Sequence, residues 1–185
     1  MTNLQNRKIL ILAADGFEDE ELYGPRTALL NAGATVILAS PHEGPIRGCV
    51  YNLETGNSDL SDETITPDRL IADVEADQFD ALVLPGGVVN PDKLRLDQKA
   101  IALVREFVAA DKLVASVCHG PWLLVEADVL RGRRTTAWYS IRTDLKNAGA
   151  TVVDEEVVVD GNIITSRMPS DIPAFNRAIV AALQG

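Results

Sequence analysis

The feature that most limits how this 185-residue chain can fold is a set of three short apolar runs, each followed directly by a turn. They span residues 8–14, 81–84 and 112–117. Continuous apolar runs of this length are typical of central strands that are covered on both faces. Helical patterns lie between the runs, and strands that alternate with helices predict a mostly parallel sheet between two helical layers. The sequence therefore predicts an α/β fold, and its length suits one domain over residues 1–185.

The segments around these strands predict the remaining elements. Asp97 caps a helix whose apolar side chains lie on one stripe, formed by Ile101, Val104, Phe107 and Val108. Residues 157–164 predict a C-terminal β-hairpin with an Asp-Gly turn, and a last helix opens at residues 170–173. Residues 41–66 are rich in Gly, Pro, Asn, Asp and Ser, which predicts an irregular excursion with one short strand at 49–51.

Composition restricts the possible partners. A formal net charge of −10 disfavours binding to nucleic acid or to acidic membranes, and the basic segment Arg131–Arg134 is better explained as a solvated loop. No apolar run is long enough to span a bilayer, and the first residues show no secretory pattern. We therefore expect a cytoplasmic protein with neither nucleic acid nor membrane as partner, and with no metal or cofactor.

The turn after the third apolar run carries Cys118 and His119, followed by Gly120 and Pro121. A thiol at a helix start meets free N–H groups and the positive end of the helix dipole, which predicts a lowered pKa. Adjacent residues do not face each other on a regular helix, but they can at a tight turn, so His119 is a candidate proton acceptor. Cys49 lies in the loop-rich stretch and is expected to be structural.

Two other turns should converge on this thiol, because ligands bind beyond the carboxyl ends of parallel strands. Residues 18–21 are four consecutive acids, and their pattern alone leaves open which carboxyl reaches Cys118. Gly86 and Gly87 follow the second run, and glycines at a strand end let backbone N–H groups approach a substrate oxygen. The turn lacks the Lys-Ser/Thr ending of a phosphate loop.

These motifs together resemble the DJ-1/PfpI superfamily. The likeness runs from about Lys8 to the last helix, and His119 directly after the cysteine is similar to the PfpI "intracellular protease" branch. The matching segments are Ala115–Pro121, Leu84–Gly87, Phe17–Asp19, Asp160–Asn162 and Thr165–Arg167.

The resemblance implies a flavodoxin-like three-layer sandwich, similar to class I glutamine amidotransferases, and a homodimer or higher homo-oligomer. It selects Glu18 as the acid that faces Cys118. It also implies an oxyanion site at Gly87 and the His119 N–H, with Gly86 and Gly120 in the same binding set. In the PfpI branch an acid from a neighbouring subunit orients the histidine, and the matching residue here is Asp92.

The implied function is a stress-response cysteine hydrolase, either an intracellular peptidase or a dicarbonyl and glycation-repair enzyme. Its substrate would be a small carbonyl compound, a peptide or a protein. Asp92 stands where the branch has Glu, on a loop one residue longer, which argues against proteolysis more than against carbonyl chemistry. The alternative is a cysteine redox sensor or chaperone-like protein with little turnover. A flavin-binding module is disfavoured, because residues 14–18 would repel a phosphate.

Overall fold

A seven-stranded sheet in the order β10-β11-β7-β6-β1-β2-β5 forms the centre of the computed structural model, which describes residues 4–52 and 54–185. Its strands are β1 (Lys8–Leu12), β2 (Thr35–Ser40), β5 (Arg69–Leu70), β6 (Ala81–Leu84), β7 (Leu113–Val117), β10 (Val157–Asp160) and β11 (Ile163–Ser166). Neighbouring strands are parallel except for β10, which runs antiparallel to β11. The predicted mostly parallel sheet is confirmed.

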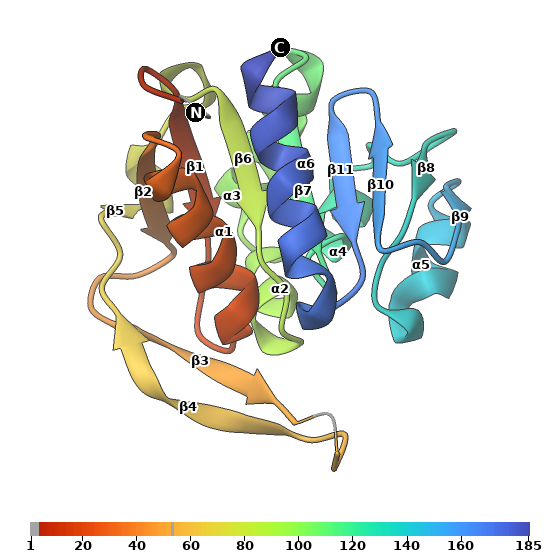
Figure 1. Ribbon diagram of the computed structural model, residues 1–185, viewed down its shortest axis with the longest axis horizontal. Coiled ribbons are helices and arrows are strands. Elements are labelled where there is room, and N and C mark those ends of the chain that lie inside the picture. The colour runs from red at the N-terminus through yellow and green to blue at the C-terminus, as the bar shows by residue number, and fades with distance from the viewer. Residues whose placement is uncertain (1–3, 53) are drawn as a thin grey trace.

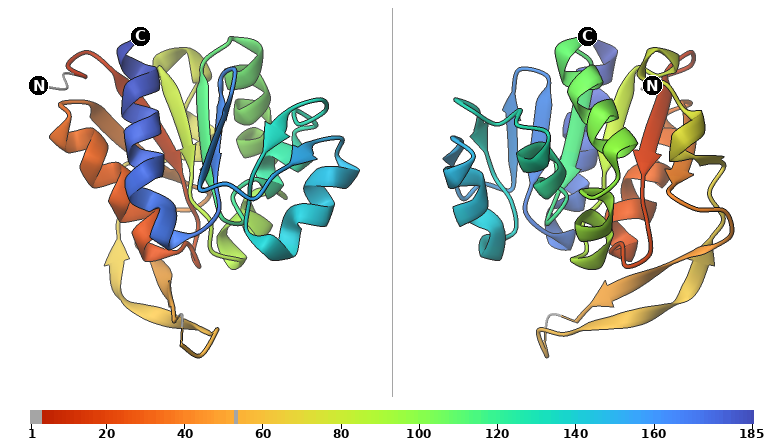
Figure 2. Two further views of the ribbon diagram at one scale, coloured as in Figure 1. Left: turned by 45° about the vertical axis from the view of Figure 1, so that its right-hand side comes forward. Right: turned by 180° about the vertical axis from the view of Figure 1, so that it is seen from behind.

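Helices cover both faces of this sheet and complete a three-layer sandwich, with α1 and α6 on one face and α3 on the other (Figures 1 and 2). The α-helices of the described residues are α1 (Asp19–Asn31), α2 (Val89–Leu94), α3 (Gln98–Ala109), α4 (Trp122–Glu126), α5 (Arg142–Asn147) and α6 (Ile172–Gln184). α1 and α6 approach closely at Gly24, where an added Cβ would lie 2.6 Å from Ile172 Cγ2.

The core lies between the layers and contains the apolar runs seen in the sequence. Residues 9–12 of β1 are fully buried, as are Phe107 of α3 and Phe175 of α6. α3 begins where predicted, because the Asp97 carboxylate accepts the N–H groups of Lys99 and Ala100 at 2.9 and 3.1 Å. No helix in the described part of the chain is long and apolar enough to cross a membrane.

Residues 41–66 contain more regular structure than predicted. β3 (Ile46–Tyr51) and β4 (Ser58–Ile65) pair antiparallel and project from the sandwich as a two-stranded arm, here called the β3–β4 arm (Figure 1). The expectation of an irregular excursion is therefore wrong for most of this segment. Most of β4 is exposed, so it lacks the alternating apolar pattern that a buried strand face requires.

The predicted C-terminal hairpin is confirmed as β10 and β11, with Gly161 at φ 58° in its turn. A separate two-stranded sheet pairs β8 (Arg134–Thr135) with β9 (Thr151–Val152). Across the main sheet Ile11 of β1, Val83 of β6 and Ala115 of β7 lie in one register row. The turns that follow these three strands therefore meet at the same edge of the sheet, as the sequence predicted.

Candidate active site

A pocket of about 270 Å³ opens at this edge, and both Cys118 and His119 line it. Carboxyl groups and aromatic rings form much of the rest of its lining. Its residues are Glu18, Glu21, Tyr51, Gly56, Ser58, Gly87, Val88, Cys118, His119, Trp138, Tyr139, Ser140 and Pro169. The turns that follow the three strands therefore contribute residues to one cavity.

Cys118 lies at a sharp turn between β7 and α4 and has φ 62°, a left-handed conformation that is unfavourable for a non-glycine residue. Its N–H donates to Ser166 O at 3.1 Å, and its carbonyl accepts the Trp138 N–H at 3.0 Å. Gly120 completes the turn, since an added Cβ there would lie 2.5 Å from Leu84 O. The turn is therefore as tight as the sequence predicted and presents the thiol to the pocket.

His119 turns back toward the thiol, with Nδ1 3.3 Å from Cys118 Sγ. Its other nitrogen, Nε2, lies 3.3 Å from Ser140 Oγ. The ring packs against Trp122 and Trp138, with centroid separations of 5.2 and 5.9 Å. Burial lowers the pKa of His119 to about 4, so the imidazole is neutral near pH 7 and can accept a proton.

The carboxyl group against the thiol belongs to Glu21. Its Oε2 accepts the Gly86 N–H at 2.9 Å, and the carboxyl is hydrogen bonded with Cys118. Burial, helped by the charge of Glu18, raises the pKa of Glu21 to about 8. Oε1 receives no hydrogen bond from a described N–H or O–H group, so it is the oxygen on which a proton facing the thiol would sit.

The expectation that Glu18 faces Cys118 is wrong in this structure. Glu18 is the N-cap of α1, where its carboxylate accepts the Glu21 N–H at 3.0 Å, although it also lines the pocket. Glu21 lies one turn later on the buried face of the helix, in line with Pro25 and Leu29 at intervals of four residues. That spacing was the sequence signal that could have identified it.

The thiol pKa also differs from the prediction. Burial and the Glu21 carboxylate raise the pKa of Cys118, whereas the N–H groups of His119 and Gly87 lower it. The prediction that the helix start lowers the pKa of the Cys118 thiol is therefore wrong while Glu21 is charged. Ionising both groups would place two negative charges in one buried site, so the pair retains one proton to high pH. When Glu21 holds that proton, it stabilises the thiolate by donating to it.

The three candidate oxyanion glycines have different environments. Gly87 lines the pocket at φ 72°, and an added Cβ would lie 2.2 Å from Gly16 O, so only glycine fits. The Gly86 N–H is occupied by Glu21, and the Gly120 N–H donates to Val117 O at 2.8 Å. The N–H groups of Gly86 and Gly120 therefore have structural partners, whereas those of Gly87 and His119 lie near the thiol, and the Gly87 N–H also faces the Glu21 carboxylate.

Asn90 is a buried residue of the site that the sequence reasoning missed. Its Oδ1 accepts the Ala14 N–H at 2.7 Å, and its Nδ2 donates to the carbonyl groups of Pro85 and Gly86, both at 3.0 Å. The side chain therefore ties the turn after β1 to the turn after β6. Asp92 lies two residues further along α2 and is not among the described hydrogen-bond partners of His119 within one chain.

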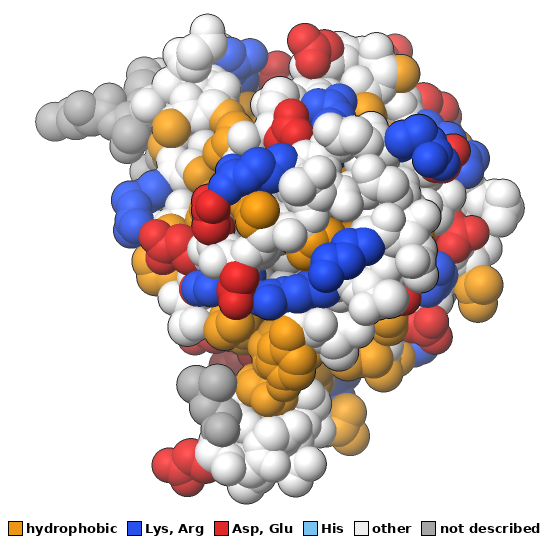
Figure 3. All heavy atoms as spheres, turned by 90° about the vertical axis from the view of Figure 1, so that its right-hand side faces the viewer, with side chains coloured by type: hydrophobic (Ala, Val, Ile, Leu, Met, Phe, Trp, Pro, Cys, Tyr) orange, Lys and Arg blue, Asp and Glu red, His pale blue; other side chains and the backbone are white. Residues whose placement is uncertain are grey.

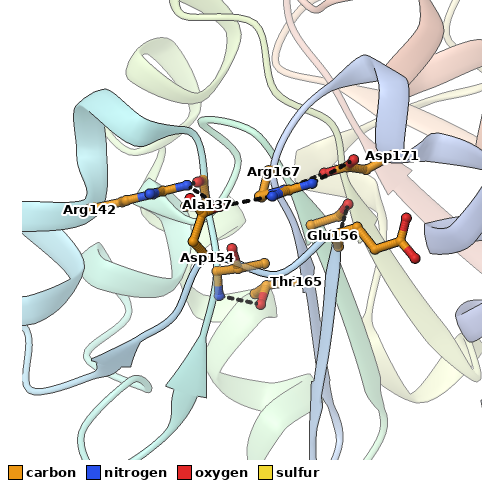
Figure 4. Close-up of polar contacts among 9 residues, drawn as sticks. Ala137, Arg142, Asp154, Glu156, Thr165, Arg167 and Asp171 are labelled. Carbon is orange, nitrogen blue, oxygen red and sulfur yellow. Dashed lines mark hydrogen bonds and ion pairs between the residues drawn. The ribbon is translucent and has the colours of Figure 1, made fainter.

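An arginine network surrounds the segment that contains Ala137 (Figure 4), and the next three residues of that segment line the pocket. Asp154 binds Arg142 and Arg167, both at 2.8 Å, and Arg167 also binds Asp171 at 2.8 Å. Arg142 Nε donates to Ala137 O at 3.4 Å. Basic and acidic side chains alternate over this side of the molecule (Figure 3). The network therefore fixes the loop that carries Trp138, Tyr139 and Ser140.

Curated proteins similar to this chain include several with deglycase in their names. Deglycase TK1284 of Thermococcus kodakarensis is 44% identical over 177 residues, which cover 96% of this chain and 99% of that protein. Protein/nucleic acid deglycase 2 of Escherichia coli is 42% identical over 179 residues, with 96% and 98% coverage.

Solved structures show the same fold. Drosophila melanogaster DJ-1beta superposes with a TM-score of 0.82 at 29% identity, covering 96% of this chain and 90% of that one. A protein of Anabaena variabilis with DJ-1/ThiJ/PfpI-like and ferritin-like domains gives a TM-score of 0.88 at 37% identity. That match covers 97% of this chain and 48% of the longer two-domain chain. A profile of the DJ-1/PfpI family matches residues 7–182, and with these relatives it establishes that the chain belongs to the DJ-1/PfpI family.

Proposed function

We propose that this protein is a glycation-repair hydrolase, which removes a 2-oxoaldehyde adduct from an amino or guanidino group by way of Cys118. The observation that carries the proposal is the strained turn at Cys118. At this turn the thiol lines the pocket and contacts both Glu21 and His119. The deglycase names of relatives at 42 to 44% identity support the same substrate class.

The proposed reaction needs no external oxidant. The Cys118 thiolate displaces the nitrogen of the adduct N–CH(OH)–CO–R, so a C–S bond forms, the C–N bond breaks and the amine leaves with the proton of Glu21. The Glu21 carboxylate then moves the proton of the S–CH(OH) carbon to the neighbouring carbonyl carbon, and the hydroxyl proton passes to the oxygen of that carbonyl. The first carbon is oxidised to a thioester and the second is reduced to an alcohol. Water hydrolyses the thioester and releases a 2-hydroxy acid and the thiol.

The remaining groups have defined parts in these steps. The N–H groups of Gly87 and His119 lie near Sγ and would bind the oxyanion that forms when water attacks the thioester. His119 is neutral at pH 7 because burial lowers its pKa to about 4, and it would accept a proton from that water. Peptide hydrolysis ranks second, because the group beside Nε2 is the Ser140 hydroxyl and no carboxylate among the described residues of one chain contacts the ring.

We also propose that the protein forms a homodimer or a higher homo-oligomer, in which Asp92 reaches His119 of another copy. Apolar side chains around Asp92 support this assembly, since Val88, Val89 and Leu96 are 48, 50 and 78% exposed. Sedimentation of the intact protein tests the proposal, and a concentration-independent monomer would contradict it.

The test of the enzymatic proposal uses N-acetylarginine that has been reacted with methylglyoxal, with lactate and free N-acetylarginine as products. The wild type should form both, and Cys118→Ala should form lactate at least about 10³-fold more slowly. Cys49→Ala is the matched control, because the Cys49 thiol donates to Gly16 O outside the pocket lining. A parallel assay with free methylglyoxal measures scavenging of the dicarbonyl alone. Full activity in Cys118→Ala would overturn the proposal.

A further inference from the structure

We propose that Glu18, Tyr51 and Tyr139, which line the same pocket as Cys118, select adducts that carry a guanidinium cation. The inference rests on the proposed function and deepens it by naming modified arginine as the preferred substrate over neutral or anionic adducts. It concerns binding of the cationic part of the substrate and not the bond-breaking steps at Cys118.

The charge of the pocket is the first observation behind this inference. Glu18 and Glu21 are 4% and 0% exposed, and both line the cavity, whereas none of its lining residues is Lys or Arg. Oε1 of the buried Glu21 lacks a hydrogen-bond donor among the described residues. Two carboxyl groups without a counter-ion give the pocket a negative potential when they ionise, and the net charge of −10 has the same sign. A phosphate-bearing adduct would be repelled.

The aromatic rings are the second observation. Tyr139 is 58% exposed and packs one face on Trp138, with ring centroids 4.4 Å apart and an interplanar angle of 31°. Tyr51 meets Trp138 edge-on at 5.1 Å and 81°, and its hydroxyl is hydrogen bonded with the side chain of Tyr139. Hydrophobic side chains gather below the band of basic and acidic side chains in Figure 3. Exposed tyrosine faces beside a carboxyl group suit a planar cation, which stacks on the rings.

Glu18 connects the charged and the aromatic residues of the pocket lining. Its carboxylate receives the Glu21 N–H at 3.0 Å and also the backbone N–H of Tyr51, so the tip of the β3–β4 arm is tied to the start of α1. These two donors fix the carboxylate in place, and it has no cationic partner among the described residues. An arginine adduct keeps its guanidinium charge, so one group can pair with Glu18 and stack on tyrosine at once.

The test measures binding rather than turnover, and it uses intact Cys118→Ala protein with two matched ligands. N-acetylarginine amide carries the cation, and N-acetylcitrulline amide replaces it by a neutral urea of the same shape. Calorimetry should give a dissociation constant at least about tenfold lower for the arginine compound. Glu18→Gln keeps an oxygen for the cap and should bring this ratio close to one. Tyr139→Leu, at an exposed ring, should weaken arginine binding by about threefold.

Equal affinity for the two ligands, or an unchanged ratio in both variants, would overturn the inference. If Glu18→Gln failed to fold, the exposed Tyr139→Leu variant and the ligand pair would still decide the question. Failure of the proposed function has a different signature, because wild-type protein would then form no lactate while the ligand preference in Cys118→Ala remained.

Discussion

Replacing Glu21 by Gln should remove much of the pH dependence of folding stability. The side chain is fully buried, and its pKa is raised from 4.5 to about 8, chiefly by burial. A buried acid with a raised pKa favours the folded state while it is protonated, and this stabilisation is fully present below about pH 4.5. It is lost as the pH rises toward 8, because the unfolded chain ionises freely and the folded chain does not. Gln is isosteric and can still accept the Gly86 N–H.

The size of the effect follows from the two pKa values. Between pH 5 and pH 8 the wild type should lose about 3 to 4 kcal/mol of unfolding free energy through Glu21, since one pH unit corresponds to about 1.4 kcal/mol. The Gln variant lacks this contribution. The opposite trend from His119, whose pKa is lowered to about 4, is present in both proteins and cancels in the comparison.

Urea unfolding followed by far-ultraviolet circular dichroism at pH 5 and pH 8, with a reductant present, measures the two free energies for each protein. The free energy of unfolding of the variant should rise relative to that of the wild type by about 3 to 4 kcal/mol from pH 5 to pH 8. A difference that stays constant within about 1 kcal/mol would refute the reasoning, since it would mean that Glu21 ionises in the folded protein as easily as in the unfolded one.

Three further results are expected from the same geometry. Gly87→Ala should lower stability by about 2 kcal/mol or more in urea unfolding, because φ is 72° and the new Cβ would meet Gly16 O; an unaffected midpoint would show that the turn can relax. Asn90→Ala should cost about 3 kcal/mol, since it breaks three buried hydrogen bonds, and a cost below about 1 kcal/mol would speak against its role in joining the turns. Mild peroxide should oxidise Cys118 before Cys49, because the Cys118 thiol lines the pocket beside the neutral His119 and Cys49 lies outside that lining; peptide mapping that finds Cys49 modified first would contradict this order.

The sheet and the position of the site could be predicted from sequence because both depend on local patterns. The apolar runs and the turns after them define β1, β6 and β7, and their parallel register brings those turns together. The pairing of Cys118 with His119 followed from the tight turn, which the structure shows at φ 62°.

The missed features depend on packing between distant segments. Glu18 and Glu21 have the same chemistry, and only the direction of α1 against the sheet edge determines which carboxyl meets the thiol. Asn90 is defined by partners at residues 14, 85 and 86, which no local pattern joins. The β3–β4 arm is largely solvated, so its strands are fixed by pairing with each other and not by an apolar face.

The aromatic contacts of His119 make the protein a reporter of its own site. The chain contains two tryptophans, Trp122 and Trp138, and both rings pack against the imidazole. All indole emission of the molecule therefore originates beside the candidate active site. Intrinsic fluorescence can therefore follow ligand entry, oxidation of the neighbouring thiol and protonation of the imidazole without a label. The rest of the fold contributes no tryptophan emission.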